Sequence, residues 1–267
     1  MEEIEMLYQQ IQMQYEDGQL EEAKRNLEHM LEQLEDTYQE RERCYSFSHV
    51  LEVYLFINVM HQNADTIQYC EHDFPALYHL YGQMLTELQD FDCAVHAYER
   101  ALYWNPVDVD AMFALAELYK AMGEPEAVQR MANQAYALCI SRSDMAKYYR
   151  SQGYFYLESY KPALAAALYQ YSYIFYPSSK ATEELDYLEK AQGKPIPKLS
   201  VKELQSRLKQ VSLPIGPKED TIGLLYQVAH VLLANGKQEE AVDCFKLVFD
   251  ITQDKEVEQL LEQLTAK

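Results

Sequence analysis

Apolar residues recur three or four positions apart along most of this chain, and short polar or glycine-containing breaks divide them into pairs of segments. This spacing predicts amphipathic helices joined as helical hairpins. The clearest hairpin covers residues 81–106, with a break at Gln89 and Asp90. Small residues stand where two helix axes would cross closely, a tyrosine fills the space beyond them, and a proline ends the unit. The positions that carry this pattern are Gly82, Ala94, Tyr98, Ala101 and Pro106.

Similar spacing predicts further hairpins over residues 4–33, 109–140, 144–177 and 222–251. One hairpin cannot cover its own outer apolar face, so stacked copies are expected. The register of the 144–177 hairpin stays open. One alignment places Gly153, Ala165 and Tyr169 at the crossing, and the other places Ala163 there.

The remaining segments are less regular. Residues 45–61 predict a helix, and a shorter helix is expected near residues 64–70, so this pair is at best a degenerate hairpin. Residues 34–43 are highly charged and are expected to extend the preceding helix into solvent. Residues 254–265 predict a final amphipathic helix that caps the array.

These elements predict one continuous array over residues 1–267. Residues 1–72 would hold degenerate N-terminal hairpins, and residues 75–177 the best-formed repeats. Residues 178–217 form an irregular, basic segment with several prolines. Residues 218–267 would add a last repeat and its capping helix.

The clearest hairpin resembles a tetratricopeptide repeat, a 34-residue helix–turn–helix unit. The matching residues are Tyr78, Gly82, Ala94, Tyr98, Ala101 and Pro106. The resemblance implies an all-α protein, an α-solenoid or superhelix of stacked antiparallel helix–turn–helix repeats. It also implies that the first helix of each hairpin lines a concave groove, where family members usually bind peptides or protein segments.

Two rows of candidate groove residues follow from this register. An aromatic row beside a hydrogen-bonding row suits an extended peptide or an amphipathic helix. The first row is Tyr8, His79, Phe113 and Tyr226, joined by Tyr148 or Arg150 depending on register, and the second is Gln12, Gln83, Glu117 and His230. The alternative is that some of these rings pack between hairpins. The Lys, Asn and Arg clamp by which some family members hold a partner's C-terminus is not evident, because its positions hold His79, Gln83 and Ala114.

Charge indicates what kind of partner to expect. The net charge of −20 argues against nucleic-acid binding and favours a protein or peptide partner with basic patches, although it also serves solubility. Residues 1–42 hold 13 acidic and 3 basic residues, a balance of −10. Residues 190–218 hold 7 basic residues and 1 acidic residue, a balance of +6. The basic segment is expected to be a solvated linker, to dock on the acidic array, or to contact an acidic partner.

The chain contains no apolar window of about 20 residues, so no membrane association is expected. Its acidic start lacks the features of a signal peptide, which predicts a cytoplasmic protein. The five cysteines are scattered and form no CxxC pair, so they are expected to be free, buried thiols. The oligomeric state stays open.

Catalytic and cofactor motifs are absent from the sequence: it contains no GxGxxG, phosphate loop, HExxH or GxSxG. We therefore predict no cofactor, no metal site and no enzyme activity. The first hypothesis is an interaction scaffold that binds a partner segment in its groove. The second is a peptide-sensing regulatory module that changes conformation on ligand binding. An enzymatic hypothesis requires an unexpected pocket near residues 178–217.

Overall fold

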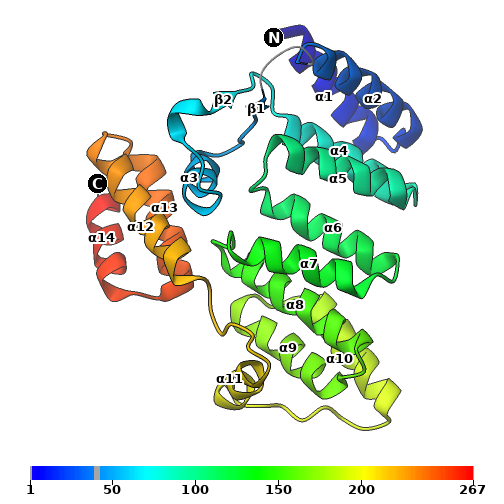
Figure 1. Ribbon diagram of the computed structural model, residues 1–267, viewed down its shortest axis with the longest axis vertical. Helices are drawn as coiled ribbons and strands as arrows, with labels where there is room; N and C mark the ends of the chain where they lie inside the picture. Colours follow the sequence, from blue (N-terminus) through cyan, green and yellow to red (C-terminus); the bar gives the residue numbers. More distant parts are fainter. Residues whose placement is uncertain (1, 39–42, 267) are drawn as a thin grey trace. The chain divides into compact units, whose positions relative to one another are not determined.

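The computed structural model describes residues 2–38 and 43–266, and fourteen α-helices lie within this part of the chain (Figure 1). The helices pack in successive pairs, which confirms the predicted all-α class of stacked helical hairpins. The chain forms two compact units. Unit 1 comprises Met1–Ile57 and His61–Leu118, and unit 2 comprises Asn58–Met60 and Tyr119–Lys267.

Unit 1 is built around two helical hairpins, and α2 also packs against α4. Left-handed backbone closes the first turn at Gly18 and the second at Gln89, where a break was predicted. The helices are α1 (Glu2–Glu16), α2 (Leu20–Asp36), α4 (Phe74–Glu87), α5 (Phe91–Trp104) and α6 (Val109–Ala121), whose last three residues belong to unit 2.

The segment between α2 and α4 is not a hairpin of two helices. Strands β1 (Cys44–Tyr45) and β2 (Gln68–Tyr69) pair in parallel, and the connection between them holds α3 (Val50–Val59) and the 3₁₀ helix η1 (Ala64–Thr66). The predicted helix over residues 45–61 therefore begins five residues later than expected. The predicted extension of the preceding helix over residues 34–43 is confirmed for residues 34–36 and wrong for residues 37 and 38, because α2 ends at Asp36. Residues 39–42 lie outside the described residues.

Glu35 links the two hairpins of unit 1. Its Oε1 atom accepts hydrogen bonds from Tyr78 Oη at 2.6 Å and from Trp104 Nε1 at 3.1 Å. Arg100 donates to the same atom through Nε at 3.1 Å and also through its Nη2 group. One carboxylate at the end of α2 thus satisfies donors from both α4 and α5.

Unit 2 continues with helices α7 to α14. A capping box begins α11: the Ser200 side chain accepts from the Glu203 N–H, and the Glu203 carboxylate accepts from the Ser200 N–H at 2.8 Å. The helices are α7 (Pro125–Tyr136), α8 (Arg142–Glu158), α9 (Pro162–Phe175), α10 (Ser179–Gln192), α11 (Val201–Gln210), α12 (Glu219–Ala234), α13 (Gln238–Thr252) and α14 (Lys255–Thr265).

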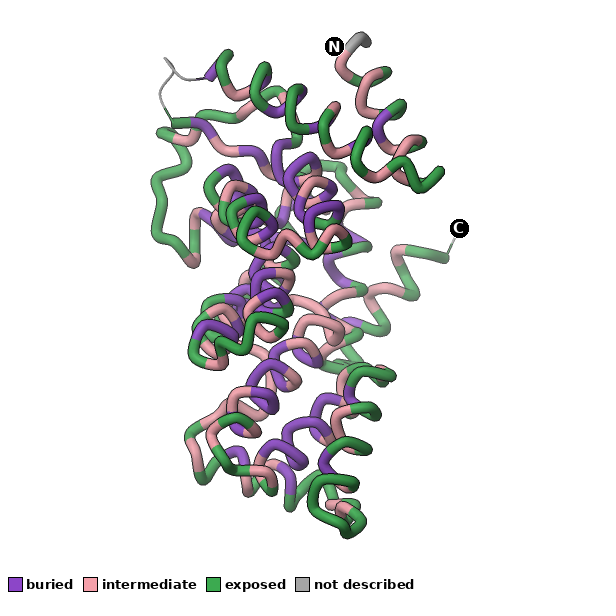
Figure 2. Tube along the Cα trace, turned by 90° about the vertical axis from the view of Figure 1, so that its right-hand side faces the viewer, coloured by how far each residue is buried: buried purple, intermediate pink, exposed green. Residues whose placement is uncertain are grey.

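The crossing of α8 and α9 resolves the open register. Gly153 faces the ring of Tyr169, where a Cβ atom on residue 153 would lie 2.7 Å from Cε1. Ala165 is buried at the crossing and Ala163 is exposed. The alignment through Gly153, Ala165 and Tyr169 is therefore the correct one. Figure 2 shows the result as buried stretches that alternate with exposed ones along the helices.

All five cysteines are free thiols, but not all are buried. Cys44, Cys139 and Cys244 lie in the interior, whereas Cys70 is half-buried and Cys93 is exposed. The expectation of burial is thus wrong for Cys93, because it lies on the solvent side of α5. In the described parts of the chain, every helix is too short or too polar to cross a membrane.

Candidate partner-binding groove

A groove of about 540 Å³ opens in unit 1 beside α1, α2 and the start of α4. Its floor is apolar and buried, formed mainly by Met30 and Leu34 of α2 and Leu77 of α4. Its rim is acidic, since Glu5, Glu71 and Asp73 are exposed. The full lining is Ile4, Glu5, Tyr8, Met30, Leu34, Glu71, His72, Asp73, Ala76 and Leu77.

Tyr8, a residue of the predicted aromatic row, lies in this groove and is partly buried. Burial raises the pKa of its phenol, and the negative charges of Asp73 and Glu5 raise it further, while the Gln12 amide one turn along α1 lowers it. The hydroxyl therefore stays protonated at neutral pH, so it can donate a hydrogen bond at the edge of an apolar floor. The helical spacing places Gln12 on the same face of α1.

On α4 the same face continues from Ala76 to His79 and Gln83, because these residues are three and four positions apart. Gln83 is exposed. His79 is not a free donor: its Nε2 atom lies 2.8 Å from Asp108 Oδ2, and 24% of its side chain is exposed. Burial lowers the pKa of His79, but the hydrogen bond and charge of Asp108, together with the charges of Asp110 and Asp73, outweigh burial, so the net pKa is raised.

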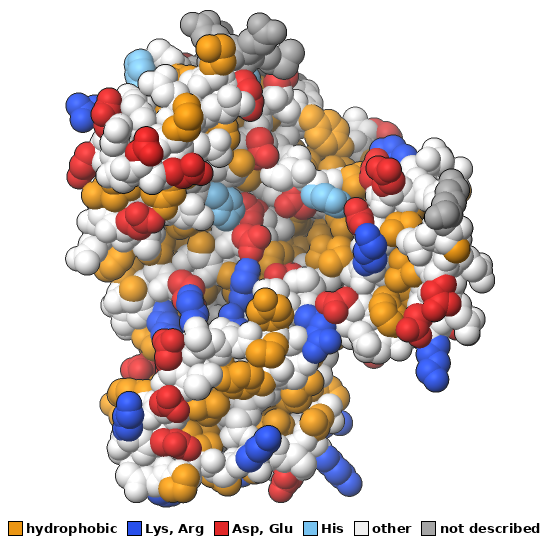
Figure 3. All heavy atoms as spheres, turned by 180° about the vertical axis from the view of Figure 1, so that it is seen from behind, with side chains coloured by type: hydrophobic (Ala, Val, Ile, Leu, Met, Phe, Trp, Pro, Cys, Tyr) orange, Lys and Arg blue, Asp and Glu red, His pale blue; other side chains and the backbone are white. Residues whose placement is uncertain are grey.

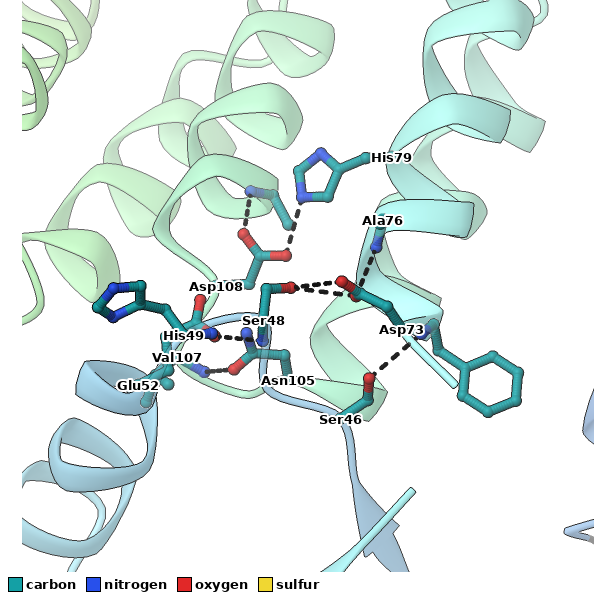
Figure 4. Close-up of polar contacts among 12 residues, drawn as sticks. Ser46, Ser48, His49, Glu52, Asp73, Ala76, His79, Asn105, Val107 and Asp108 are labelled. Atoms are coloured by element: carbon teal, nitrogen blue, oxygen red, sulfur yellow. Dashed lines mark hydrogen bonds and ion pairs between the residues drawn. The ribbon is translucent and has the colours of Figure 1, made fainter. Parts of the chain in front are cut away.

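A network of polar contacts fixes the groove-bearing start of α4 (Figure 4). Asp73 caps α4 by accepting from Ala76 N at 3.1 Å, and its carboxylate also accepts from Ser48 Oγ at 3.0 Å. Asp108 caps α6 through Ala111 N at 2.9 Å while its other oxygen holds His79. In the close-up, the carboxylates of Asp73 and Asp108 each accept a hydrogen bond from the first turn of the helix that they cap. Capping α4 holds the carboxylate of Asp73 in place beside the groove.

One carboxyl group in the same network is held in an unfavourable environment. Burial raises the pKa of Glu52, although N–H donors of His49 and Ser48 and the neighbouring Asn105 amide oppose the shift. The Nδ2 atom of Asn105 is buried without a hydrogen bond of good geometry, so its contact with Glu52 is weak. These groups stabilise the loops around residues 48 and 105 and do not face the groove lining.

The third members of the two predicted rows, Phe113 and Glu117, both lie on α6 and differ in how far they reach solvent. Phe113 on α6 is only 4% exposed, so its ring belongs to the interior and offers no accessible surface in this structure. This outcome follows the alternative in which rings pack between hairpins. Glu117, one turn further along α6, is exposed and interacts with other residues of the chain.

Tyr226 and His230 lie in unit 2, on the exposed face of α12. Their rings meet edge to face at 4.6 Å, and both contact the ring of Phe245 on α13. Within unit 2 they form a small aromatic cluster of their own. Tyr148 is buried in the same unit, and Arg150 is half-buried and has interactions of its own.

Sequence reasoning missed the acidic rim of the groove. The string Glu71-His72-Asp73 stands directly before α4, and a helix start is where exposed carboxylates gather. Pairing these residues with Glu5 required knowledge of how α1 and α4 pack. Figure 3 shows acidic side chains distributed widely over the face that includes α1, α2, α4 and α5.

A second groove, of about 550 Å³, forms in unit 2 between α9, α10 and α11, in the region where an enzymatic hypothesis required a pocket. Its lining is mostly apolar. The Gln170 amide donates to the carbonyl of Pro197 at 3.1 Å and accepts from the N–H of Leu199 at 3.0 Å. Glu189 accepts from the N–H of Ile196 at 2.8 Å. Among the described residues that line it, the ionisable side chains are those of Tyr173, Glu189 and Lys198.

A family model described as a tetratricopeptide repeat matches residues 75–108 and 222–255. The first match covers α4 and α5 with the His79 face, and the second covers α12 and α13 with Tyr226 and His230. The chain contains two tetratricopeptide repeats. The resemblance predicted from Gly82, Ala94 and Tyr98 is thereby confirmed, and each unit carries one matched repeat.

Eleven solved chains match this chain. One is a tetratricopeptide repeat protein from Parabacteroides merdae ATCC 43184, 14% identical with a TM-score of 0.49, over 99% of this chain and 84% of that one. Another is YrrB, described as a TPR protein with an unusual peptide-binding site, 14% identical with a TM-score of 0.36, over 70% of this chain and 91% of that one. No curated protein matches the sequence.

Proposed function

We propose that this protein is an interaction scaffold whose unit 1 groove binds a partner segment that places Lys or Arg beside apolar residues. The observation that carries the proposal is the combination at one groove of a buried apolar floor and three exposed carboxylates, Glu5, Glu71 and Asp73. Tetratricopeptide repeat proteins present such surfaces to protein partners and generally act as scaffolds.

The apolar floor and the acidic rim of the groove would make different contributions to binding. Apolar side chains of a partner would be buried against Met30, Leu34 and Leu77, which supplies affinity through area removed from water. The carboxylates would attract a basic segment and orient it, which contributes more to specificity and association rate than to affinity. Tyr8 would add a ring surface and one hydrogen-bond donor.

The decisive experiment compares groove variants in a pulldown from native lysate, followed by binding measurements on the retained protein. The groove variants are Tyr8→Ala and the pair Glu5→Lys with Glu71→Lys. The matched control pair is Glu22→Lys with Glu32→Lys, which makes the same change of charge on exposed positions of α2 outside the groove. Circular dichroism establishes that each variant is folded.

We expect a protein retained by the wild type and the control pair to be lost by both groove variants. A synthetic peptide of its binding segment should contain Lys or Arg and should bind more weakly at 300 mM than at 50 mM salt, because screening at roughly 0.1 M and above reduces exposed charge attraction. A partner that binds the groove variants and the wild type equally would place the function elsewhere.

A further inference from the structure

Aromatic rings gather in unit 2 from the end of α7, the middle of α8 and the end of α9. Tyr149 meets Tyr171 edge to face at 4.8 Å, and it meets Tyr148 at 5.1 Å. Tyr136 lies 4.9 Å from Tyr148, and Phe175 stacks on Tyr149 at 5.3 Å. This tyrosine cluster is separate from both grooves described above.

Three hydroxyls of the tyrosine cluster bind three consecutive carbonyls of one short segment. Tyr149 Oη donates to the carbonyl of residue 214 at 3.0 Å, and Tyr171 Oη donates to that of residue 215 at 2.6 Å. Tyr136 Oη donates to the carbonyl of residue 216 at 2.9 Å. Each donor comes from a different helix, so the cluster recognises the backbone of an irregular stretch of chain.

The bound segment, here named the strap, is Leu213 to Pro217, Leu-Pro-Ile-Gly-Pro. It connects α11 to α12, has no regular secondary structure, and is only half-buried throughout. Its two prolines supply no N–H group, so few backbone donors need a partner. Among the described residues, the carbonyls of residues 214–216 accept hydrogen bonds from the tyrosine hydroxyls alone.

This arrangement has the features of peptide recognition. Aromatic rings that pack on proline-containing segments and donate to their carbonyls are a recurring recognition mode in proteins. Burial raises the pKa of Tyr149, Tyr171 and Tyr136, which keeps the three hydroxyls protonated as donors. Hydrogen bonds to carbonyls carry little information about side chains, so a segment of another protein with the same backbone character would satisfy them equally.

We propose that the tyrosine cluster is a second peptide-binding site, occupied here by the chain's own strap, and that it accepts a proline-containing segment of a partner protein in exchange. The occupant it favours has a Leu-Pro-x-Gly-Pro character: apolar, poor in N–H donors and without regular structure. The site is independent of the unit 1 groove, so either could fail without affecting the other.

Tethering explains why the site is closed in the isolated chain. A covalently linked ligand on a short connection has an effective concentration in the millimolar range, so a free peptide of equal intrinsic affinity must compete with it. Two hydrogen bonds hold the helices on either side of the strap. On the α11 side, Gln205 Nε2 donates to the Tyr171 hydroxyl at 3.3 Å. On the α12 side, Thr221 Oγ1 donates to the Ala137 carbonyl at 2.7 Å.

The test uses the full chain and a fluorescein-labelled synthetic peptide with the sequence of residues 210–219. A strap variant carries Pro214→Ser, Ile215→Ser and Pro217→Ser, which removes apolar contacts and restores N–H groups without changing the length. Fluorescence anisotropy should show that the strap variant binds the peptide at least about tenfold more tightly than the wild type. Adding Tyr149→Phe and Tyr171→Phe should reverse that gain by about tenfold.

The matched control is Tyr187→Phe in the strap variant, which removes a hydroxyl from an exposed ring on α10 and should leave binding unchanged. A peptide with both prolines replaced by alanine should bind more weakly. The proposal is overturned if the strap variant keeps the wild-type circular dichroism spectrum and binds no better than the wild type. It is also overturned if the two tyrosine substitutions leave the affinity unchanged.

If the strap variant does not fold, the wild-type chain provides the test. Excess unlabelled peptide at millimolar concentration should increase hydrogen exchange of residues 215–221, since it displaces the strap. Exchange rates that stay unchanged up to that concentration would overturn the proposal.

Discussion

The ring of Tyr98 lies directly over Gly82: a Cβ atom on residue 82 would stand 2.6 Å from Tyr98 Cε2. Gly153 and Tyr169 repeat this relationship in unit 2 at 2.7 Å. Both tyrosines are buried, so their rings have little room to move away. Only glycine permits the two helices of each hairpin to approach this closely.

Gly82→Ala should therefore destabilise the protein although alanine favours helices. Overpacking costs roughly 1–3 kcal/mol, and the better helix propensity of alanine returns about 1 kcal/mol. Urea unfolding measures the difference. Gly223→Ala is the matched control, because Gly223 is helical and exposed and a Cβ atom there meets nothing within 4 Å. The control should be stabilised, and a stabilised Gly82→Ala would show that the crossing is looser than described.

Phe113→Ala should reduce stability rather than act on binding alone. The ring is 4% exposed, and removing a buried phenylalanine costs roughly 3–5 kcal/mol. Tyr226→Ala is the comparison: because Tyr226 is 37% exposed, its removal should reduce the free energy of unfolding much less. Thermal and urea unfolding of both variants check this. Equal small losses would mean that Phe113 is accessible, as the sequence pattern first predicted.

Glu35→Ala should weaken the connection between the two hairpins of unit 1. It leaves donors of Tyr78, Arg100 and Trp104 without their shared acceptor, and such losses cost roughly 1–3 kcal/mol. Glu32→Ala, an exposed site on the same helix, controls for the loss of a charge. Tryptophan fluorescence follows unfolding directly, since the single Trp lies at the site. Similar curves for the two variants would contradict the role of Glu35.

His79 should make stability depend on pH. Its pKa is raised above 6.5 in the folded state, so the folded state binds its proton more tightly than the unfolded state. The stabilising contribution is therefore complete below pH of about 6.5 and is lost as pH rises through the raised pKa. Proton NMR titration should show a lower pKa for His79 in Asp108→Asn, a variant in which the asparagine can still cap α6. An unchanged titration would remove Asp108 as the cause.

The sequence predicted the hairpins well because their pattern is local. The spacing of Gly82, Ala94 and Tyr98 contains the crossing itself, and the same spacing selects the correct alignment at Gly153 and Tyr169 once burial is known. Helix ends with strong signals, such as Ser200 with Glu203, were also predictable.

The misses involve contacts between residues distant in sequence. The β1–β2 pairing joins Cys44 to Gln68 across 24 positions, and no local pattern indicates it. The accessible faces were less predictable still, because whether a ring such as Phe113 or Tyr226 reaches solvent depends on which neighbour covers it. The binding role of the eight predicted groove residues stays a prediction.

Cys93 has a practical consequence. It is the one fully exposed thiol of the five and Cys70 is half-buried, so a maleimide dye can be directed to α5 once Cys70 is replaced by serine. A hydrogen bond to Asp90 raises the pKa of its thiol, so little thiolate is present at neutral pH and conjugation should need mildly alkaline buffer. A dye there would place a spectroscopic reporter on the hairpin that carries the best-formed repeat.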